Sequence, residues 1–292
     1  QIVLNKRLKF SYYSKGKKKT ESMLKMFKRY ELEEKDWIKI YKYCKNKKII
    51  FFSTPQNISD LNFLKKNFKL PAIKVGSDDF VNIPLIKSYL RSGIPLILST
   101  GMADLNDFKR ILNIKDINKS KIIFLLCTSE YPCKHENVNI RKLKSLKKII
   151  KKSHLIGFSD HTIDNTSSVL SISEGCCFFE KHFTLSNNME GPDHWFSLNP
   201  QNLKLWVKSI RDAYICMGKE DLVPTINEKK NKKFFQRRIV AVKKIKKGDV
   251  IKKDQIAYLR VSDEKALPPY QENKILGKKS KYNFKPGQIL KI

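Results

Sequence analysis

Six short apolar runs recur between residues 48 and 184, and this repetition constrains the possible fold more than any other feature of the chain. Each run has a β-branched and aromatic core that is apolar on both faces, which is typical of strands buried in a parallel sheet. The runs are KIIFFSTP, PAIKVGS, IPLILSTG, KIIFLLCTS, HLIGFSDHT and CFFEKHFT. We therefore expect a strand at each of them.

Segments with helical periodicity and helix-boundary residues separate or follow these runs. One runs from Asn82 to Gly93, and another begins at Asn199 and Pro200 and stops at Gly218. Asn is a good N-cap, Pro is favoured at the first helical position, and Gly is common just past the end. Because strands and helices alternate regularly, the sequence predicts an α/β fold with right-handed crossovers.

Nearly every predicted strand ends in small polar or ionisable residues. These are Ser53-Thr54, Gly76-Ser77, Ser99-Thr100, Thr128-Ser129, Ser159-Asp160-His161 and His182-Phe183-Thr184. In a (β/α)₈ TIM barrel the carboxyl ends of all strands meet on one face, whereas a doubly wound sheet concentrates such residues at one switch point. The distribution favours the barrel, although only six of its eight strands are found.

The character of the sequence changes after residue 219. Residues 220–236 form a charged stretch with one proline and no clear period, which predicts a linker. Residues 237–292 hold short alternating strands with KKGD and KPG as turns, which predict a small β-rich module. The expected division is thus a barrel domain at 1–219, a linker at 220–236 and a second domain at 237–292.

The formal net charge of +32 suggests nucleic-acid binding, because phosphate backbones favour dense arrays of cations. However, only nine of the 60 basic residues are Arg, the residue suited to bidentate phosphate and base recognition, and the lysines spread over the whole chain. The two densest runs, Lys15–Thr20 and Asn227–Arg238, are predicted to be a solvated loop and part of the linker. Specific nucleic-acid binding is therefore not favoured.

The cysteines and the apolar runs bear on the compartment. The six cysteines include no CxxC pair, and Cys176 and Cys177 are adjacent, which indicates free thiols in a reducing environment. No apolar run reaches the ~18–20 residues of a membrane span, and no signal peptide opens the sequence. We expect a cytoplasmic protein with no membrane partner.

Two histidines lie directly at the ends of predicted strands, His161 after the fifth run and His182 in the sixth. Taken singly, each could be a hydrogen-bonded structural residue. Because they lie on successive strands, both should project into the same mouth of the barrel, which indicates either a divalent metal site or an acid/base pair. His135, in a loop, and His154, at a strand start, receive no role.

Lys74 lies inside an apolar run, in the sequence IKVGS. Burying a lysine is costly unless its ammonium meets an anion, although the side chain could also extend to the rim. Hydroxyl residues at the neighbouring strand ends would bind a phosphate together with it. They are Thr54, Ser77, Ser99, Ser129 and Ser159. The site would then hold a phosphate-bearing substrate beside a metal, and without a GxGxxG or P-loop motif a dinucleotide or NTP is not indicated.

Seven short motifs carry a resemblance to a known family. They are STP, KVGS, ILSTGM, CTSEYP, GFSDHT, EKHFTL and GPDH. In this order and at these separations they resemble the sialic acid synthase family of N-acetylneuraminate and legionaminate synthases. The C-terminal module resembles the antifreeze-protein-like SAF domain, a β-clip fold, that ends those enzymes.

The resemblance implies a transferase that condenses phosphoenolpyruvate with an N-acetylmannosamine-type aldehyde, forming a nine-carbon 2-keto acid and phosphate. His161 and His182 would bind Mn²⁺ or Mg²⁺ and, together with Lys74, would be the catalytic residues. The phosphoenolpyruvate pocket would consist of Lys74, Thr54, Ser77, Ser99, Ser129 and Ser159. The sugar-side contacts would be Asp79, Tyr131 and Asp193, while an ordinary loop carboxylate is the alternative for Asp193.

Arg260 matches an SAF-domain arginine of the family that reaches the partner subunit's site, which implies a domain-swapped homodimer. The family's first strand, with a catalytic-site Glu, and its second, with a phosphate-binding Lys, have no counterpart in this sequence. The chain is therefore expected to lack the first β-α-β unit of the TIM barrel and, as it stands, to be inactive or poorly folded. Ser186 stands where Asp is common, which leaves one contact open.

Two alternative functions are compatible with the sequence. The first is another metal-dependent aldolase or phosphoenolpyruvate synthase of sugar acids on the same fold. The second is a non-catalytic basic protein that binds carbohydrate or nucleic acid through its C-terminal module.

Overall fold

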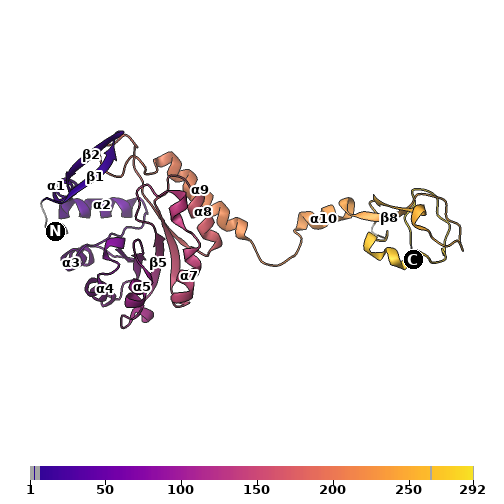
Figure 1. Ribbon diagram of the computed structural model, residues 1–292, viewed down its shortest axis with the longest axis horizontal. Coiled ribbons are helices and arrows are strands. Elements are labelled where there is room, and N and C mark those ends of the chain that lie inside the picture. Colours follow the sequence, from indigo (N-terminus) through magenta and orange to yellow (C-terminus); the bar gives the residue numbers. More distant parts are fainter. Residues whose placement is uncertain (1–2, 4–6, 264, 292) are drawn as a thin grey trace. The chain divides into compact units, whose positions relative to one another are not determined.

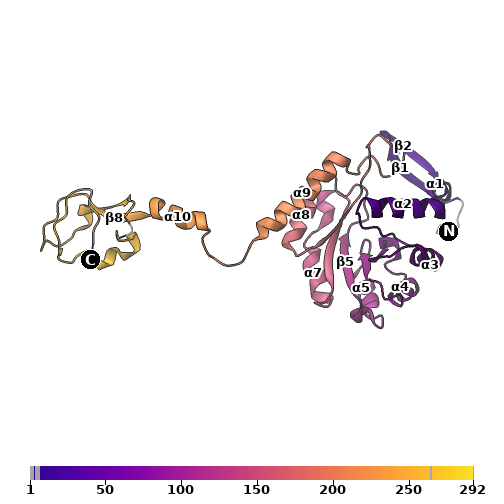
Figure 2. The same ribbon diagram turned by 180° about the vertical axis from the view of Figure 1, so that it is seen from behind.

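Two compact units make up the chain in the computed structural model, residues 1–218 and residues 219–292. The structure describes residue 3, residues 7–263 and residues 265–291. The first unit contains the strands and helices up to α9, and the second begins before α10 (Figure 1; Figure 2 shows the reverse side). Each unit has a hydrophobic core of its own.

A curled sheet of five parallel strands forms the centre of the first unit (Figure 1). The strands lie in sequence order: β3 (Ile73–Val75), β4 (Leu96–Ser99), β5 (Ile122–Cys127), β6 (Leu155–Asp160) and β7 (Phe178–Lys181). Five of the six apolar runs are therefore strands, and the predicted α/β fold is confirmed. Strands in sequence order, each joined to the next through helices on one side of the sheet, form the half of a barrel.

The first apolar run, residues 48–55, does not form a regular strand, so that prediction is wrong. Among the described residues, its backbone link to the sheet is one hydrogen bond, from Lys74 N to Ser53 O at 3.4 Å. The run lies beside β3, and its Phe52 packs against Ile97 and Leu125 on the concave side. Apolar content draws the segment to the sheet, but a strand also needs a ladder of backbone hydrogen bonds.

Helices cover the other face of the sheet and bury its apolar side chains. They are α3 (Ile58–Asn67), α4 (Ile83–Leu90), α5 (Leu105–Leu112), α6 (His135–Val138), α7 (Lys142–Ile149), α8 (Thr166–Ser173) and α9 (Pro200–Met217), with the 3₁₀ turns η1 (Ser77–Asp79) and η2 (Ile117–Lys119). The predicted helix boundaries hold: the Asn82 side chain accepts from Leu85 N, and Asn199 caps α9. Gly218, at φ +55°, ends α9 as expected.

The curl of the sheet brings its two outer strands toward each other. Lys74 on β3 and Glu180 on β7 form an ion pair across the concave face, with Nζ 3.3 Å from Oε2. Because three strands separate β3 from β7 in the sheet, a flat sheet of this order would hold these residues far apart. The two outer strands therefore approach each other across the concave face.

The segment before the sheet contains a β-hairpin that the sequence did not reveal. β1 (Lys9–Ser14) pairs antiparallel with β2 (Lys17–Ser22), followed by α1 (Met23–Tyr30) and α2 (Glu34–Asn46). Lys15 and Gly16 have φ of +50° and +73° and form the two-residue turn. The prediction of a solvated loop at Lys15–Thr20 is wrong, because most of this run is strand β2, whose lysines are solvated while its backbone is paired.

The second unit is a small β-rich domain preceded by a helix. Its elements are α10 (Ile226–Phe235), β8 (Arg237–Ala241), β9 (Ile256–Arg260) and the 3₁₀ turns η3 (Lys253–Gln255) and η4 (Pro269–Lys274). The segment at 220–236 that we expected as a linker contains α10, which starts with a capping box formed by Thr225 and Glu228. The predicted turns at Gly248 and Gly287 have φ of +92° and +88°.

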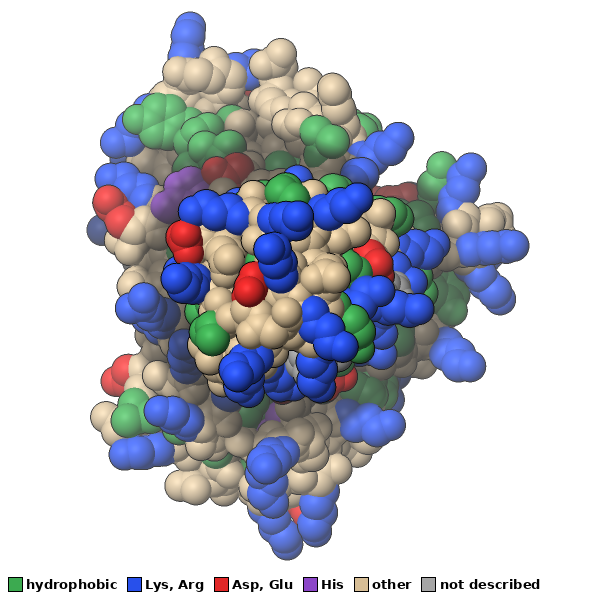
Figure 3. Space-filling model, turned by 90° about the vertical axis from the view of Figure 1, so that its right-hand side faces the viewer, with side chains coloured by type: hydrophobic (Ala, Val, Ile, Leu, Met, Phe, Trp, Pro, Cys, Tyr) green, Lys and Arg blue, Asp and Glu red, His purple; other side chains and the backbone are tan. Residues whose placement is uncertain are grey.

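On the side of the second unit that Figure 3 shows, lysine and arginine side chains are scattered instead of forming one stripe. This side therefore does not outline a nucleic-acid groove, which requires clustered basic residues. Among the helices of the described residues, none combines the length and the apolar character that crossing a membrane requires.

Candidate active site

The strand alternation places a row of polar side chains on the concave face of the sheet. On each strand the residues in the main core face the helices, as Ile73 and Val75 do on β3 and Phe158 does on β6. The intervening residues face the concave side. From β3 to β7 and the positions just beyond, these are Lys74, Ser99, Cys127, Ser159, His161, Glu180 and His182. They define the candidate site.

Lys74, on the outer strand β3, belongs to this face and is only 8% exposed. Its Nζ donates to Ser99 Oγ at 2.7 Å and to the backbone oxygen of Val75 at 3.2 Å, and it pairs with Glu180. The side chain of Glu180 is 40% exposed, so the carboxylate partner of this ammonium is accessible to solvent. A buried cation held by a hydroxyl and an accessible carboxylate is suited to exchange that partner for an incoming anion.

Several of the predicted hydroxyl residues gather near this lysine. Ser99 and Ser159 are each 3% exposed. Ser77 Oγ, in η1, accepts from Gly101 N at 3.0 Å, and a side chain at Gly101 would collide with the hydroxyls of Ser77 and Ser129. Ser129 Oγ is buried without a hydrogen-bond partner among the described residues. An unpaired buried hydroxyl of this kind is satisfied when a ligand supplies an acceptor.

The two histidines predicted at the strand ends lie side by side. The ring centroids of His161 and His182 are 5.2 Å apart, with the rings nearly perpendicular at 82°. Tyr131 packs over both, at 4.2 Å from His161 and 5.6 Å from His182, and Phe196 closes the other side at 5.2 Å from His182. The structure thus brings together the pair that the sequence singled out and adds Phe196, which it did not.

Each imidazole has an oxygen atom close to its Nδ1, at hydrogen-bond distance for His161 and at a longer distance for His182. His161 Nδ1 lies 2.7 Å from the backbone oxygen of Thr128, so this nitrogen carries the proton and donates, which leaves the lone pair on Nε2. His182 Nδ1 lies 3.5 Å from Asp193 Oδ2. Burial lowers the pKa of His182, although Asp193 and Glu180 oppose this shift, so the imidazole is neutral near pH 7. A neutral ring whose second nitrogen is held by an oxygen is the usual state of a metal-binding histidine.

Cys127 and Glu180 are site residues that the sequence reasoning missed. Cys127 Sγ lies 3.9 Å from His161 Nδ1. Burial raises the pKa of this thiol, but contacts with His161, Ser77 and Ser159 outweigh it, so its pKa lies below the usual value. The two-residue period would have found both: Cys127 ends β5, and Glu180 precedes His182 by two residues.

Three predicted residues do not join this group directly. Asp79 accepts from Asn82 Nδ2 at 2.9 Å, next to the cap of α4. Thr54 lines a cavity of about 440 Å³ with residues of α2 and α3. Arg260 belongs to the second unit, where its guanidinium lies 5.4 Å from the centre of the Phe235 ring. Their predicted roles remain predictions.

Among the described residues, no three His, Cys, Asp or Glu side chains converge as a metal cluster. A metal at this site would therefore rest on the two histidine nitrogens, with its other positions taken by water or substrate. An open coordination sphere is what a catalytic metal needs.

Comparison with known proteins identifies the family. The NeuB family matches residues 1–221, and the SAF domain matches residues 236–292. The chain belongs to the NeuB family. The motifs of this NeuB-family chain that resemble sialic acid synthases include both histidines and Lys74, the residues that the fold gathers on the concave face.

Two curated relatives cover almost the whole chain. N,N'-diacetyllegionaminic acid synthase of Campylobacter jejuni is 33% identical over 99% of this chain and 86% of its own length. The protein of the same name from Legionella pneumophila is 28% identical over 99% of this chain and 81% of its own. Among solved structures, the N-acetylneuraminic acid synthetase of Leptospira borgpetersenii matches with a TM-score of 0.66 and 28% identity, covering 71% of this chain and 72% of that one.

Proposed function

We propose that the protein condenses phosphoenolpyruvate with an N-acetylmannosamine-type aldehyde. In this reaction C3 of the enol phosphate bonds to the aldehyde carbon, and the aldehyde oxygen takes a proton and becomes a hydroxyl. Water adds to C2. The bond between C2 and the phosphate ester oxygen then breaks, which leaves a 2-keto acid and inorganic phosphate. One water is consumed, and the product has nine carbons when the sugar has six.

Lys74 is the observation that carries the proposal. It is a buried ammonium on the concave face of the sheet, near the paired histidines, in a family whose named relatives are synthases of sialic-acid-like sugars. In the proposed complex the substrate phosphate replaces Glu180 as the counter-ion of Lys74. Ser99, Ser77 and Ser159 donate to its oxygens, as does the unpaired hydroxyl of Ser129. For Thr54, the same role rests on the sequence resemblance alone.

We further propose that His161 and His182 hold a divalent cation through their Nε2 atoms. A cation bound there would polarise the aldehyde oxygen as a Lewis acid. Mn²⁺ fits better than Mg²⁺, because Mg²⁺ strongly prefers oxygen ligands and the two protein ligands here are imidazoles. Thr128 and Asp193 keep the rings in the orientation that points these lone pairs at the site.

The sugar-side contacts proposed are Asp193, Tyr131 and Asp79. Asp193 is exposed in the loop after β7 and already faces His182, so it can accept hydroxyl groups of the sugar beside the cation. Because the two curated relatives described above are diacetyllegionaminic acid synthases, a 2,4-diacetamido-6-deoxy sugar is the first substrate to test.

The assembly we propose is a homodimer in which Arg260 of one subunit reaches the site of the other. The curled sheet would be the larger part of a (β/α)₈ barrel, and the unpaired cysteines favour a reducing compartment such as the cytoplasm. The alternative on the same fold is another metal-dependent aldolase or phosphoenolpyruvate synthase of sugar acids.

The test measures phosphate release from phosphoenolpyruvate in the presence of Mn²⁺ and either N-acetylmannosamine or its 2,4-diacetamido-6-deoxy relatives. His161→Ala and His182→Ala should each abolish metal-dependent turnover, whereas His135→Ala, an exposed histidine, should not. If the folded protein turns over none of these sugars, the proposal fails.

A further inference from the structure

A buried ion pair lies directly behind the two histidines. Asp160, the last residue of β6, and Lys181, the last residue of β7, are register partners in the parallel ladder. Their side chains are 0% and 3% exposed, and Asp160 Oδ2 lies 3.1 Å from Lys181 Nζ. Since strand residues alternate sides, this pair faces the helices, whereas His161 and His182, one position on, face the site.

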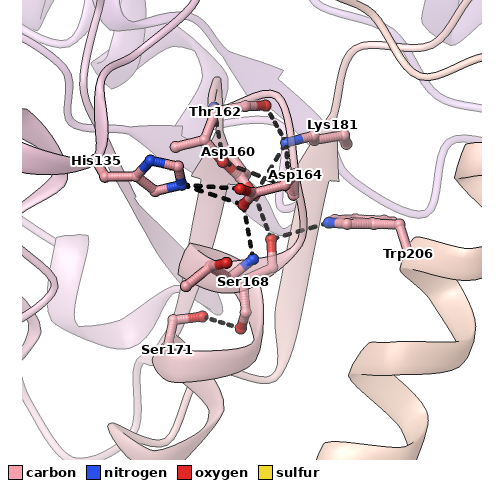
Figure 4. Close-up of polar contacts among 9 residues, drawn as sticks. His135, Asp160, Thr162, Asp164, Ser168, Ser171, Lys181 and Trp206 are labelled. Carbon is pink, nitrogen blue, oxygen red and sulfur yellow. Dashed lines mark hydrogen bonds and ion pairs between the residues drawn. The ribbon is translucent and has the colours of Figure 1, made fainter.

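Asp160 holds the turn that carries His161. Its Oδ1 accepts from the backbone N–H of Thr162 and from Thr162 Oγ1, both at 2.8 Å. Its Oδ2 accepts from Ser168 Oγ at 2.5 Å, and Ser168 Oγ in turn accepts from Trp206 Nε1 at 3.0 Å. Figure 4 shows this network reaching from the end of β6 through α8 to Trp206 on α9.

Lys181 fixes the same turn from the neighbouring strand. Besides Asp160, its ammonium donates to the backbone oxygens of Thr162 and, at 3.1 Å, Asp164 (Figure 4). Thr162 and Asp164 both follow His161 in the chain. The strand end that carries His182 is therefore tied by three polar contacts to the strand end and turn that carry His161.

The cost of this arrangement argues for a specific use. Two fully desolvated charges stabilise a fold little or not at all compared with apolar residues of the same size, because the desolvation penalty offsets their attraction. What such a pair provides is a defined geometry, since every polar atom around it must keep its partner. The backbone positions held in this way are Asp160 and Lys181, which precede the two histidines, and Thr162 and Asp164, which follow His161.

We propose that the Asp160–Lys181 pair positions the His161 and His182 imidazoles relative to each other. Asp160 and Lys181 touch neither substrate nor cation in this proposal; they act through the strand ends as positioning residues. The inference rests on the proposed function in one respect, namely that the two histidines act as a pair.

A double variant tests this without leaving a buried unpaired charge. Removing one partner alone leaves an uncompensated buried charge and can unfold the protein. Asp160→Asn with Lys181→Met keeps the acceptor for Thr162 N and the shape of the lysine chain, but loses the ammonium that holds the Thr162 and Asp164 carbonyls. The matched control is Leu146→Ala, a buried α7 residue, which removes core packing without a contact to this network.

The first readout is Mn²⁺ binding by calorimetry on the folded 292-residue chain. Loss of an outer-shell partner typically weakens metal binding by about 10- to 100-fold, and we expect this range for the double variant. Leu146→Ala should lower the melting temperature and leave the Mn²⁺ affinity unchanged. A folded double variant with wild-type Mn²⁺ affinity would overturn the proposal.

The second readout needs no metal. Imidazole ¹H–¹⁵N correlation spectra of metal-free protein report the Nδ1–H of His161, which donates to Thr128, and the environment of His182. We expect both signals to shift in the double variant and to stay in place in Leu146→Ala. Unchanged imidazole signals contradict the positioning role even if the wild-type chain binds no Mn²⁺. If the wild-type chain binds no Mn²⁺, that result refutes only the proposed metal site.

Discussion

Lys74 is the residue on which the proposed phosphate site depends most directly. Lys74→Met removes the ammonium while keeping the length of the side chain. Loss of a charged hydrogen-bond partner costs about 1.5–3 kcal/mol, so kcat/KM for phosphoenolpyruvate should fall roughly 10- to 100-fold. Stability should change little, because Glu180 is 40% exposed and stays hydrated. Steady-state kinetics measure kcat/KM for phosphoenolpyruvate in Lys74→Met and in the control Lys87→Met, at an exposed lysine. An equal loss of kcat/KM in both variants would contradict the assignment of Lys74 to the phosphate site.

His154 differs from the two site histidines in its surroundings and in its hydrogen bonding. It is 5% exposed, stacks 5.6 Å from Phe124, and neither ring nitrogen has a hydrogen-bond partner among the described residues. Burial, with a smaller effect of Lys151, lowers its pKa below 6.5. Above this pH the ring is neutral in both states. As the pH falls below it, the unfolded chain binds a proton that the folded chain resists, so stability is lost.

The prediction for His154 is therefore a change of stability with pH. In the wild type, the free energy of unfolding should fall at low pH by up to about 1.4 kcal/mol for each unit by which folding lowers the pKa of His154. His154→Phe should remove this loss. Urea unfolding measures the free energy of unfolding of the variant and of the wild type at pH 7.5 and at pH 5.5. The difference between the two proteins is then compared at the two pH values. His135→Gln, at an exposed histidine paired with Asp164, is the control. A difference that does not grow toward pH 5.5 would refute the argument.

At the scale of elements, the β1–β2 hairpin supports the loop that carries Asp193. Tyr13 stacks edge-on against Trp195 at 5.7 Å between ring centroids, Ser14 Oγ accepts from Gly191 N at 3.3 Å, and Lys19 pairs with Glu190. These contacts hold the loop after β7 from the side opposite the strand. The loop's position thus depends on an element far earlier in the chain.

Tyr13→Ala should therefore affect the sugar substrate and not phosphoenolpyruvate. An aromatic pair contributes about 0.5–1.5 kcal/mol, so the KM for the sugar aldehyde should rise roughly 3- to 10-fold. The KM for phosphoenolpyruvate, bound at Lys74, should stay the same. Tyr43→Ala, at an exposed tyrosine of α2, is the matched control. If both KM values rise together in Tyr13→Ala, the hairpin supports the whole site and not the loop.

At the scale of the whole molecule, the proposed dimer predicts complementation. A subunit with His161→Ala lacks a metal ligand but still offers Arg260, and a subunit with Arg260→Ala has the reverse defect. When the two inactive variants are mixed and allowed to exchange subunits, about half of the dimers are hybrid and each hybrid has one intact site, so about one quarter of wild-type activity should return. No recovery despite proven exchange would place Arg260 outside the partner's site.

Most of the candidate site could be predicted from the sequence because it lies at strand ends. The apolar period located β3 to β7, and the residue after each run follows from it. His161 and His182 were found this way, and Lys74 was found as a lysine inside an apolar run. Glu180 and Cys127 lie on the same face and were missed, because a lone carboxylate or thiol in an apolar run has no motif that marks it.

By itself, the sequence determined the strand–helix alternation, the helix caps and the residues at the strand ends, since all of these depend on periodicity and on neighbours within a few positions. Only the tertiary structure decided three further features: the Lys74–Glu180 pair across the curled sheet, the Asp160–Lys181 pair behind the histidines, and the hairpin on the loop of Asp193. Each joins residues on different elements. The physical reason is that curl, register and packing depend on the whole chain, whereas a local pattern reports only which side a residue faces.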